Sequence, residues 1–234
     1  NLKNILLFAI VIVSLYFVYS YVFLDSTSNV LYKGGNAKNS YTVKANKLPG
    51  SSDTVDFTYS VWIYVKDWQH RYGVEKVIWK RPGPDKDFIN VSLAGSTNAL
   101  KTTLGIISGE QLPIEIDNIP IQKWTHILIS TNNRSVDSYI DGKLVKTTVL
   151  DNMPKTEGSE TSDVLIVPKG TDQEGGFSGE ISKFRYISRT VNPREAYEIY
   201  REGPGGSWLS DLFNKYKLKL SFLKDNEEVQ SFSL

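Results

Sequence analysis

A run of twenty uncharged residues near the start of the chain limits what its first segment can be. Residues 5–24 read ILLFAIVIVSLYFVYSYVFL, with neither proline nor glycine. Twenty helical residues extend about 30 Å, the thickness of the hydrocarbon core of a bilayer, and a helix satisfies its own backbone polar groups in lipid. Tyr16, Tyr19 and Tyr21 gather toward the end of the run, as is typical of the headgroup zone. The sequence therefore predicts one transmembrane helix, with residues 1–25 as a membrane anchor.

The alternative for this run is a cleaved signal peptide. The apolar core of a signal peptide is usually shorter and precedes small residues of the A-x-A type, whereas this run ends in Phe23-Leu24-Asp25-Ser26. A retained anchor is therefore the preferred interpretation. Lys3 is the only basic residue before the run, so the distribution of positive charge favours a single-pass protein with its N-terminus inside and the remainder on the far side.

The charges and the cysteine content exclude several classes of function. Lysine and arginine number 27 against 26 acidic residues, so the net charge of +1 gives no positive field with which to recruit nucleic acid. The absence of cysteine excludes a disulfide framework, a thiolate metal site and a cysteine nucleophile. The two histidines, His70 and His126, are too few for a metal triad.

From residue 41 onward the chain changes to short runs rich in Val, Ile, Thr, Tyr, Phe and Trp, separated by Gly, Pro, Asn and Asp. In residues 57–65 apolar side chains alternate with others, which predicts a strand buried on one face. Asp141-Gly142 lies between two further runs and is the signal of a type I′ hairpin turn. The pattern predicts a sandwich or barrel over residues 41–203, after a linker of residues 26–40.

One short helix is predicted after the last of these strands. Asn192 stands at its N-cap position, Pro193 at the first helical position and Glu195 at the third. The sequence Gly203-Pro204-Gly205-Gly206 then ends the helix.

Residues 204–234 are expected to form a C-terminal tail with two short elements. Residues 208–213 carry apolar side chains on one helical face, which predicts an amphipathic turn of helix. Residues 215–222 alternate strictly, which predicts an edge strand with its lysines outward.

Four motifs in the predicted strands, with the short helix after them, occur in the order typical of one superfamily. They are FTYSVWIY at residues 57–64, WTHI at 124–127, YIDGKLV at 139–145 and GFSGEISKFRY at 176–186. In this order they resemble the concanavalin A-like lectin/glucanase superfamily, and specifically its laminin G-like domains. The resemblance implies an all-β fold of two antiparallel sheets packed as a jelly-roll sandwich.

Each motif also has a purely structural interpretation. Trp124 is expected to fill the sandwich core or its corner, because burying so large a ring dominates the local energetics. Asp141-Gly142 supplies the turn, and Gly179 marks a bulge or a close approach of two backbones. The motifs therefore indicate a fold and say little about function.

The layout of the whole chain carries a second resemblance. It combines one N-terminal anchor, one cysteine-free laminin G-like domain and a tail that begins YREGPGG at residues 200–206. In this it is similar to membrane-anchored structural proteins of large DNA viruses of algae and protists. That resemblance implies a virion component held in the membrane beneath the capsid and in contact with capsid proteins.

A catalytic site of the glucanase kind is expected to be missing. Glucanases of this superfamily carry E-x-D-x-E or E-x-D-x-x-E on one strand, because retaining hydrolysis needs two carboxyl groups about 5 Å apart. This chain offers Glu115 and Asp117, but Ile119 and Pro120 stand where the second glutamate would be. We therefore expect no enzyme activity and no catalytic residue.

Calcium is the one cofactor that the resemblance introduces, because laminin G-like domains often hold it at a sheet rim with oxygen ligands from loops. Asp163, Asp172 and Glu174, near the loop that precedes Gly176-Phe177, are the candidate ligands. Their spacing lacks the density of a dedicated site, so solvated loop acids are the preferred interpretation. No cofactor is expected to be required.

A loop after the first long strand is the best candidate for ligand contact. Its sequence includes Trp68, His70, Arg71 and Tyr72. Sugar binding needs an aromatic platform with polar groups nearby, and protein contact uses exposed aromatics and arginine equally well. The sequence does not separate a glycan from a protein at this loop.

These expectations describe a membrane-anchored, non-enzymatic β-sandwich that acts as a structural or interaction module. The preferred role is a minor virion protein, located in the internal membrane or capsid, that tethers a membrane to neighbouring proteins. Expected partners are the lipid bilayer, neighbouring proteins of that assembly and glycans, with no nucleic acid. Two alternatives stay open: a cell-surface, lectin-like carbohydrate-binding protein and a divergent glycoside hydrolase.

Overall fold

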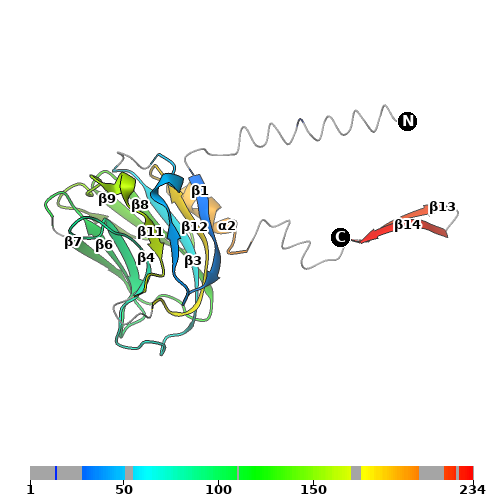
Figure 1. Cartoon of the computed structure of the whole chain (residues 1–234), viewed down its shortest axis with the longest axis horizontal. Helices are drawn as coiled ribbons and strands as arrows, with labels where there is room; N and C mark the ends of the chain where they lie inside the picture. The colour runs from blue at the N-terminus through cyan, green and yellow to red at the C-terminus, as the bar shows by residue number, and fades with distance from the viewer. Residues whose placement is uncertain are drawn as a thin grey trace.

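The computed structural model describes residues 28–50, 55–109, 111–169, 175–205, 219–224 and 227–233, together with Ser14. Its strands form two six-stranded sheets that pack face to face (Figure 1). Sheet A contains, in spatial order, β1 (Ser28–Asn36), β12 (Ser178–Ile187), β3 (Thr58–Asp67), β8 (Trp124–Asn132), β9 (Ser135–Ile140) and β10 (Lys143–Val149). Sheet B contains β2 (Tyr41–Val43), β11 (Val164–Ile166), β4 (Lys76–Arg81), β5 (Ile89–Leu93), β6 (Leu100–Gly105) and β7 (Gln111–Ile116).

The remaining described elements are short. They are the 3₁₀ turns η1 (Ala45–Lys47) and η2 (Ser159–Thr161), the helix α2 (Pro193–Arg201), and the strands β13 (Lys219–Lys224) and β14 (Glu227–Ser233). All strand pairs of the two large sheets are antiparallel. The prediction of an all-β sandwich of two antiparallel sheets with one short helix after the last core strand is confirmed.

Two local predictions are also confirmed. Asp141 and Gly142 join β9 to β10 with φ angles of 50° and 73°, the pair of left-handed conformations that a type I′ turn requires. The Asn192 side chain accepts a hydrogen bond from the Glu195 amide at 2.9 Å, which caps α2. In both places local turn and cap chemistry was enough to locate the element.

Sheet A begins earlier in the chain than the sequence suggested. β1 lies within residues 26–40, the segment expected to be a linker, and pairs along its length with β12. Gly34 and Gly35 obscured this strand, because glycine is depleted in strands and offers no side chain to the alternating pattern.

Some predictions fall outside the described part of the chain. The predicted membrane span, residues 5–24, lies outside it apart from Ser14, and so does the predicted helix of residues 208–213. Among the described residues, no helix has the length and apolar character needed to cross a bilayer. The predicted tail strand is seen in part as β13, which pairs with β14 to form a two-stranded hairpin.

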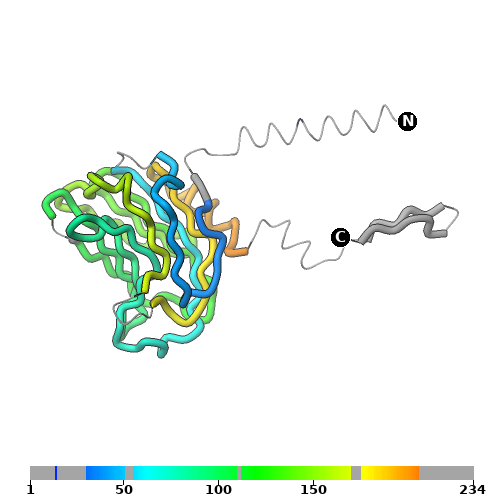
Figure 2. Tube along the Cα trace, viewed as in Figure 1, coloured from blue at the N-terminus to red at the C-terminus, as the bar shows by residue number. Residues whose placement is uncertain are grey.

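The main core lies between the two sheets, whose traces form two layers (Figure 2). Tyr59 of β3 lies at its centre, with its ring centroid 6.3 Å from that of Trp79 in sheet B and 5.9 Å from that of Phe184 in sheet A. All three side chains are buried. Aromatic side chains bury about 150–250 Å² each, so this cluster contributes much of the apolar burial that joins the sheets.

Helix α2 covers the outer face of sheet A. It contributes two apolar side chains to a second buried cluster, which takes three more from the sheet and one from the loop before the helix. The members are Ala196 and Ile199 of α2, Leu128, Tyr139 and Ile187 of the sheet, and Val191. The helix is therefore attached to the sandwich by its own small core.

This cover explains why β3 is buried on both of its faces. Thr58, Ser60 and Trp62 point away from the main core, yet all three are buried. The ring of Tyr200 from α2 stacks on Trp62 at 5.4 Å. The alternation in residues 57–65 predicted burial of one face only, because it carries no information about a helix that returns over the other face.

His126 of β8 lies under this helix and is fully buried. Its Nε2 atom is 2.8 Å from Ser60 Oγ, and its ring centroid lies 5.0 Å from that of Trp62. Nδ1 has no hydrogen-bond partner within the described part of the chain. Burial, opposed by the negative charge of Asp141, lowers the pKa of His126 to about 3, so the imidazole is neutral at neutral pH.

Gly179 of β12 allows two backbones of sheet A to approach closely. A Cβ atom at this position would lie 1.9 Å from the Tyr64 carbonyl oxygen and 3.0 Å from a ring carbon of Phe177. The register of β12 against β3 shifts between Ser178 and Gly179. The prediction that Gly179 marks a bulge or close approach is confirmed.

Substitution Gly179→Ala should therefore destabilise the fold by about 2–3 kcal/mol, because the backbone of β3 has to move away from the added methyl group. Gly109→Ala is the matched control, since Gly109 has φ +81° with nothing within 4 Å of the added Cβ. That control should cost only the strain of a left-handed alanine, about 1 kcal/mol. Urea unfolding of the two variants measures the difference, and equal losses would contradict the prediction.

Acidification should destabilise the protein through His126. The pKa of this residue is about 6.5 in an unfolded chain and about 3 in the fold, so between these values the unfolded state binds a proton that the folded state does not. The contribution is fully present above pH 6.5 and is lost as the pH falls toward 3, at about 1.4 kcal/mol per pH unit. Urea unfolding at a series of pH values measures it.

The control for this measurement is His126→Gln, which removes the titrating ring. The free energy of unfolding of the variant should fall less steeply with acidification than that of the wild-type chain. Identical slopes for the two proteins would show that His126 does not carry the pH dependence.

Candidate functional site

The loop predicted to contact a ligand, residues 68–75, joins β3 to β4 at the end of the sandwich where β3 finishes (Figure 2). The Gln69 amide donates to Asp67 Oδ1 at 2.9 Å, and the Tyr72 amide donates to the Gln69 carbonyl at 3.1 Å. The Gly73 amide donates to the Gly95 carbonyl in the loop between β5 and β6 at 3.0 Å. These bonds fix the loop against the sandwich.

Trp68 turns inward from this loop. Its side chain is half-buried against the main core, and the Lys76 ammonium lies 5.1 Å from the centre of its ring. Burial, followed by the positive charge of Arg71, lowers the pKa of Lys76. A ring covered in this way stabilises the loop and does not offer the open platform that the sequence suggested.

The other three predicted contact residues are placed differently. His70 and Arg71 are half-buried, and Arg71 adopts a left-handed φ of 54°. Tyr72 projects into solvent with 58% of its surface exposed, and Val74 is 44% exposed. Tyr72 is therefore the aromatic residue of this loop that a ligand can reach.

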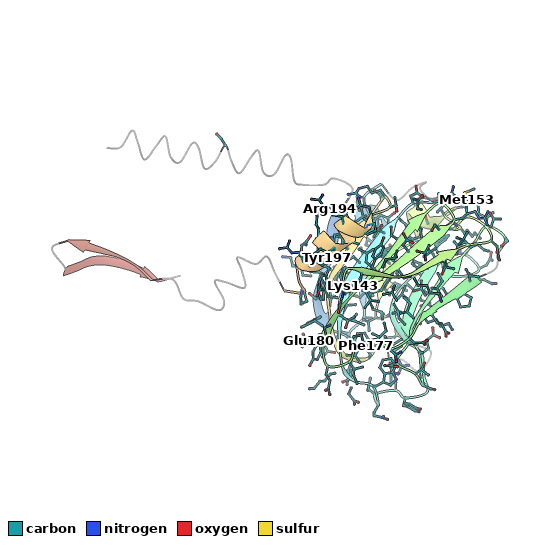
Figure 3. All side chains as sticks on the ribbon, turned by 180° about the vertical axis from the view of Figure 1, so that it is seen from behind. Lys143, Met153, Phe177, Glu180, Arg194 and Tyr197 are labelled. Atoms are coloured by element: carbon teal, nitrogen blue, oxygen red, sulfur yellow. The ribbon has the colours of Figure 1, made fainter. Side chains whose placement is uncertain are left out.

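A groove of about 270 Å³ lies beside the loop, across the ends of β1, β12 and β3. Its lining residues are Asn36, Lys38, Tyr64, Lys66, Ser178, Gly179 and Glu180. Ser178 stands opposite Asp67, whose side chain accepts the Gln69 amide, so the groove and the loop share one end of the sandwich. Glu180 is seen at this end in Figure 3. We call this end, made of residues 36–38, 64–75 and 178–180, the β3 rim.

Tyr64 supplies the aromatic surface of the groove. Its ring is half-buried and lies 5.7 Å from the ring of Trp124, centroid to centroid. Trp124 was expected to fill the core or its corner. It is instead half-buried on the outer face of sheet A. The reason is that Trp124 stands opposite Tyr64 in the β3–β8 register and shares its outward direction.

The chemistry of the groove suits a polar ligand with an apolar face. Tyr64 offers a ring surface, and Asn36, Lys38, Lys66 and Glu180 offer donors and acceptors around it. The site was not predicted from the sequence because its residues come from β1, β3 and β12, which lie far apart in the chain. The one available signal was the aromatic pair Trp62 and Tyr64 on the face of β3 that the alternation assigned to solvent.

The first candidate calcium ligand is already engaged within the fold. The Asp163 carboxylate accepts hydrogen bonds from Lys44 Nζ at 2.8 Å and from the Ala45 amide at 2.9 Å. The bond from Lys44, and then that from Ala45, lower the pKa of Asp163. Asp172 and Glu174 lie outside the described residues, and within the described ranges no three His, Asp or Glu side chains are grouped as metal ligands would be.

The incomplete glucanase motif lies on β7 and just after it. Glu115 is exposed and stands opposite Lys101 of β6, and Asp117 is exposed beyond the strand. Ile119, at the position where a second glutamate was sought, is 1% exposed and belongs to the main core. The absence of enzyme activity stays a prediction.

Solved structures with the same fold include receptor-binding domains of botulinum neurotoxins. The serotype G binding domain superposes with a TM-score of 0.53 at 19% identity over 75% of this chain and 46% of that chain. The serotype D ligand-binding domain in complex with N-acetylneuraminic acid gives 0.55 at 14% identity, over 72% and 41%. The binding domain of neurotoxin DC in complex with rat synaptotagmin II gives 0.55 at 16% identity, over 73% and 42%.

These likenesses show the fold, and the chain spans less than half of the neurotoxin binding domains that it matches. Among curated proteins, none matches the chain significantly. A family profile of laminin G type matches residues 33–196, which is more than half of the chain and includes β3, β8, β9, β10 and β12. The chain therefore belongs to the concanavalin A-like lectin/glucanases superfamily, as a lectin-like β-sandwich of laminin G type.

Proposed function

We propose that this chain is a non-enzymatic recognition protein whose sandwich binds carbohydrate in the groove at the β3 rim. The observation that carries the proposal is the groove, which is lined by Tyr64 together with residues that carry amide, ammonium and carboxylate groups. A sugar ring has an apolar face that stacks on such a ring and hydroxyl groups that hydrogen-bond to its surroundings.

The size of the groove favours a saccharide over a protein as its occupant. Its volume of about 270 Å³ is close to the lower end of small-ligand sites. A stable protein interface takes roughly 20–30 residues from each partner, whereas the groove is lined by seven. Tyr72, exposed on the adjacent loop, extends the surface for a longer oligosaccharide.

The comparisons support the proposal at the level of the fold. One of the neurotoxin domains with this fold is in complex with N-acetylneuraminic acid and another with a protein, synaptotagmin II. Recognition of either class of ligand is thus compatible with the architecture. The residues that line the groove, and not the structural similarities, favour carbohydrate as the ligand of this chain.

The second part of the proposal is that the recognition domain is tethered to a membrane by residues 5–24. Twenty consecutive uncharged residues support this, and a tether raises the effective concentration of the domain toward ligands on the same assembly. A minor structural protein of a large virus, held in an internal membrane beside the capsid, is the biological setting that the layout of the chain favours. Calcium is not needed for either part.

Tyr64→Ala should weaken carbohydrate binding about tenfold, because stacking on an aromatic ring contributes roughly 1 kcal/mol or more. A glycan array probed with the full chain in detergent identifies the oligosaccharide, and titration calorimetry compares the variants. Lys66→Ala, at an exposed position of the same groove, should also weaken binding without disturbing the fold.

Tyr197→Ala is the matched control for this experiment. Tyr197 is 48% exposed, lies on α2 and does not line the groove, and Figure 3 shows it apart from Glu180. Its loss should leave glycan affinity unchanged. The carbohydrate proposal fails if no glycan binds or if the groove variants bind as well as the control, and hydrolysis of a β-glucan that requires Glu115 would overturn the non-enzymatic assignment.

The anchor makes a separate prediction. The full chain expressed with membranes should stay in the pellet after washing with alkaline carbonate, which removes proteins attached by charge or by other proteins. Replacing Ile10 and Val13 by lysine should release it, because two charges near the centre of the span cost about 5–7 kcal/mol on insertion scales. Release of the unmodified chain by carbonate would overturn the tether and leave the carbohydrate proposal untouched.

A further inference from the structure

β10 is an exposed edge strand of sheet A. It pairs with β9 on one side, and it ends the strand order of the sheet. Every residue from Lys143 to Val149 except Thr148 is exposed. Three of the exposed side chains are apolar: Leu144 at 47%, Val145 at 51% and Val149 at 65%. A long, exposed, partly apolar edge of this kind readily accepts another strand.

The hairpin of β13 and β14 has no third strand in its sheet among the described residues. Each of its strands pairs with the other, and together they form a sheet of two strands. An isolated two-stranded hairpin is at best marginally stable in water, and a third strand or a packed face is needed to stabilise it. A sheet edge would supply the third strand that stabilises it.

Charge selects β14 as the partner of β10. β10 carries Lys143 and Lys146, and β14 begins with Glu227 and Glu228, whereas β13 both begins and ends with lysine. Opposite charges across a strand pair stabilise it and like charges destabilise it. The acidic strand of the hairpin fits the basic edge.

The same rule disfavours pairing of β10 with β10 of a second copy. An antiparallel pair centred on this seven-residue strand would place Lys146 opposite Lys146. Lys146 Nζ donates to the Glu115 carbonyl at 3.1 Å, and its ammonium has further protons for a carboxylate. A lysine partner offers it no acceptor.

The chain is long enough to make this contact within one molecule. The path out of the sandwich is fixed at Glu202, which accepts hydrogen bonds from Arg185 of β12 at 3.0 and 2.7 Å, and at Pro204, whose carbonyl accepts from Ser182 at 2.6 Å. From β12 to β10 is four strand spacings, and the docked β14 and β13 add two more, so the connection has to span about 30 Å. Fourteen residues, 205–218, connect Pro204 to β13 and can extend about 45–50 Å.

We infer that the C-terminal hairpin docks on sheet A of its own chain, with β14 adding as a seventh strand antiparallel to β10. In this register Glu228 lies beside Lys146, and Val229 lies beside Val145. The docking covers the exposed apolar side chains of β10 and gives the hairpin its third strand. It is independent of the carbohydrate groove, which lies at the other side of sheet A across β1, β12 and β3.

A disulfide trap tests the inference, because the chain has no cysteine of its own. The full chain carrying Val145→Cys and Val229→Cys, purified in detergent and mildly oxidised, should form an internal disulfide in most molecules. Peptide mass spectrometry detects the bond, and the molecule should migrate as a monomer. Loss of free thiol is the quantitative measure.

The matched control places the first cysteine on the opposite edge of sheet A. Val30 of β1 is 38% exposed, so the chain with Val30→Cys and Val229→Cys has an equally reachable thiol on the wrong edge. It should stay reduced. Preferential bonding through position 30, bonding only between two copies, or no bonding in either protein would each overturn the inference.

A charge exchange adds a second readout. Lys146→Glu in the Val145→Cys, Val229→Cys background should slow formation of the disulfide several-fold, and adding Glu228→Lys should restore it. Lys146 is exposed on the edge strand β10, and circular dichroism of the reduced proteins checks that the sandwich is intact. Equal rates in all three proteins would show that the two strands do not lie side by side.

Discussion

Sheet A has to be covered on both faces, because β3 at its centre carries large side chains in both directions. Tyr59 and Val61 require sheet B on one side, and Trp62 requires α2 on the other. The helix meets that need through its own apolar cluster, and its end is held by the paired bonds between Glu202 and Arg185. The helix covers only part of the outer face, so the ends of the strands, where Tyr64 and Trp124 are half-buried, and the two edges of the sheet stay accessible to ligands and partners.

Much of this architecture could be read from local sequence. The alternation in β3, the Asp141-Gly142 turn and the Asn192-Pro193 cap each depend on a few neighbouring residues, and the family motifs order them along the chain. The features that could not be predicted depend on contacts between residues that are distant in the sequence. The burial of Ser60 and His126 depends on a helix that begins about 130 residues after Ser60 in the chain, and the strand β1 shows itself only through its pairing with β12.

In the candidate site, too, some features could be predicted from local sequence and others depend on distant contacts. The loop containing Trp68 and Tyr72 was predicted from its composition, yet composition could not say which ring turns inward. The answer depends on Lys76, whose buried ammonium lies over Trp68 and leaves Tyr72 as the exposed ring. The groove was missed because Asn36, Tyr64 and Glu180 meet only when β1, β3 and β12 are aligned, and Gly179 allows the backbones there to approach closely.

Placing the groove and the β10 edge on opposite sides of sheet A has a consequence for how the chain can act. A ligand at the β3 rim and a strand on β10 do not compete for the same surface, so tail docking and recognition can occur together. The inferred docking is intramolecular, because residues 205–218 join the hairpin to the sandwich, and a connection of this length corresponds to an effective concentration in the millimolar range. In the inferred docking the hairpin covers the exposed edge of β10, and neighbouring copies then pair less readily through that edge.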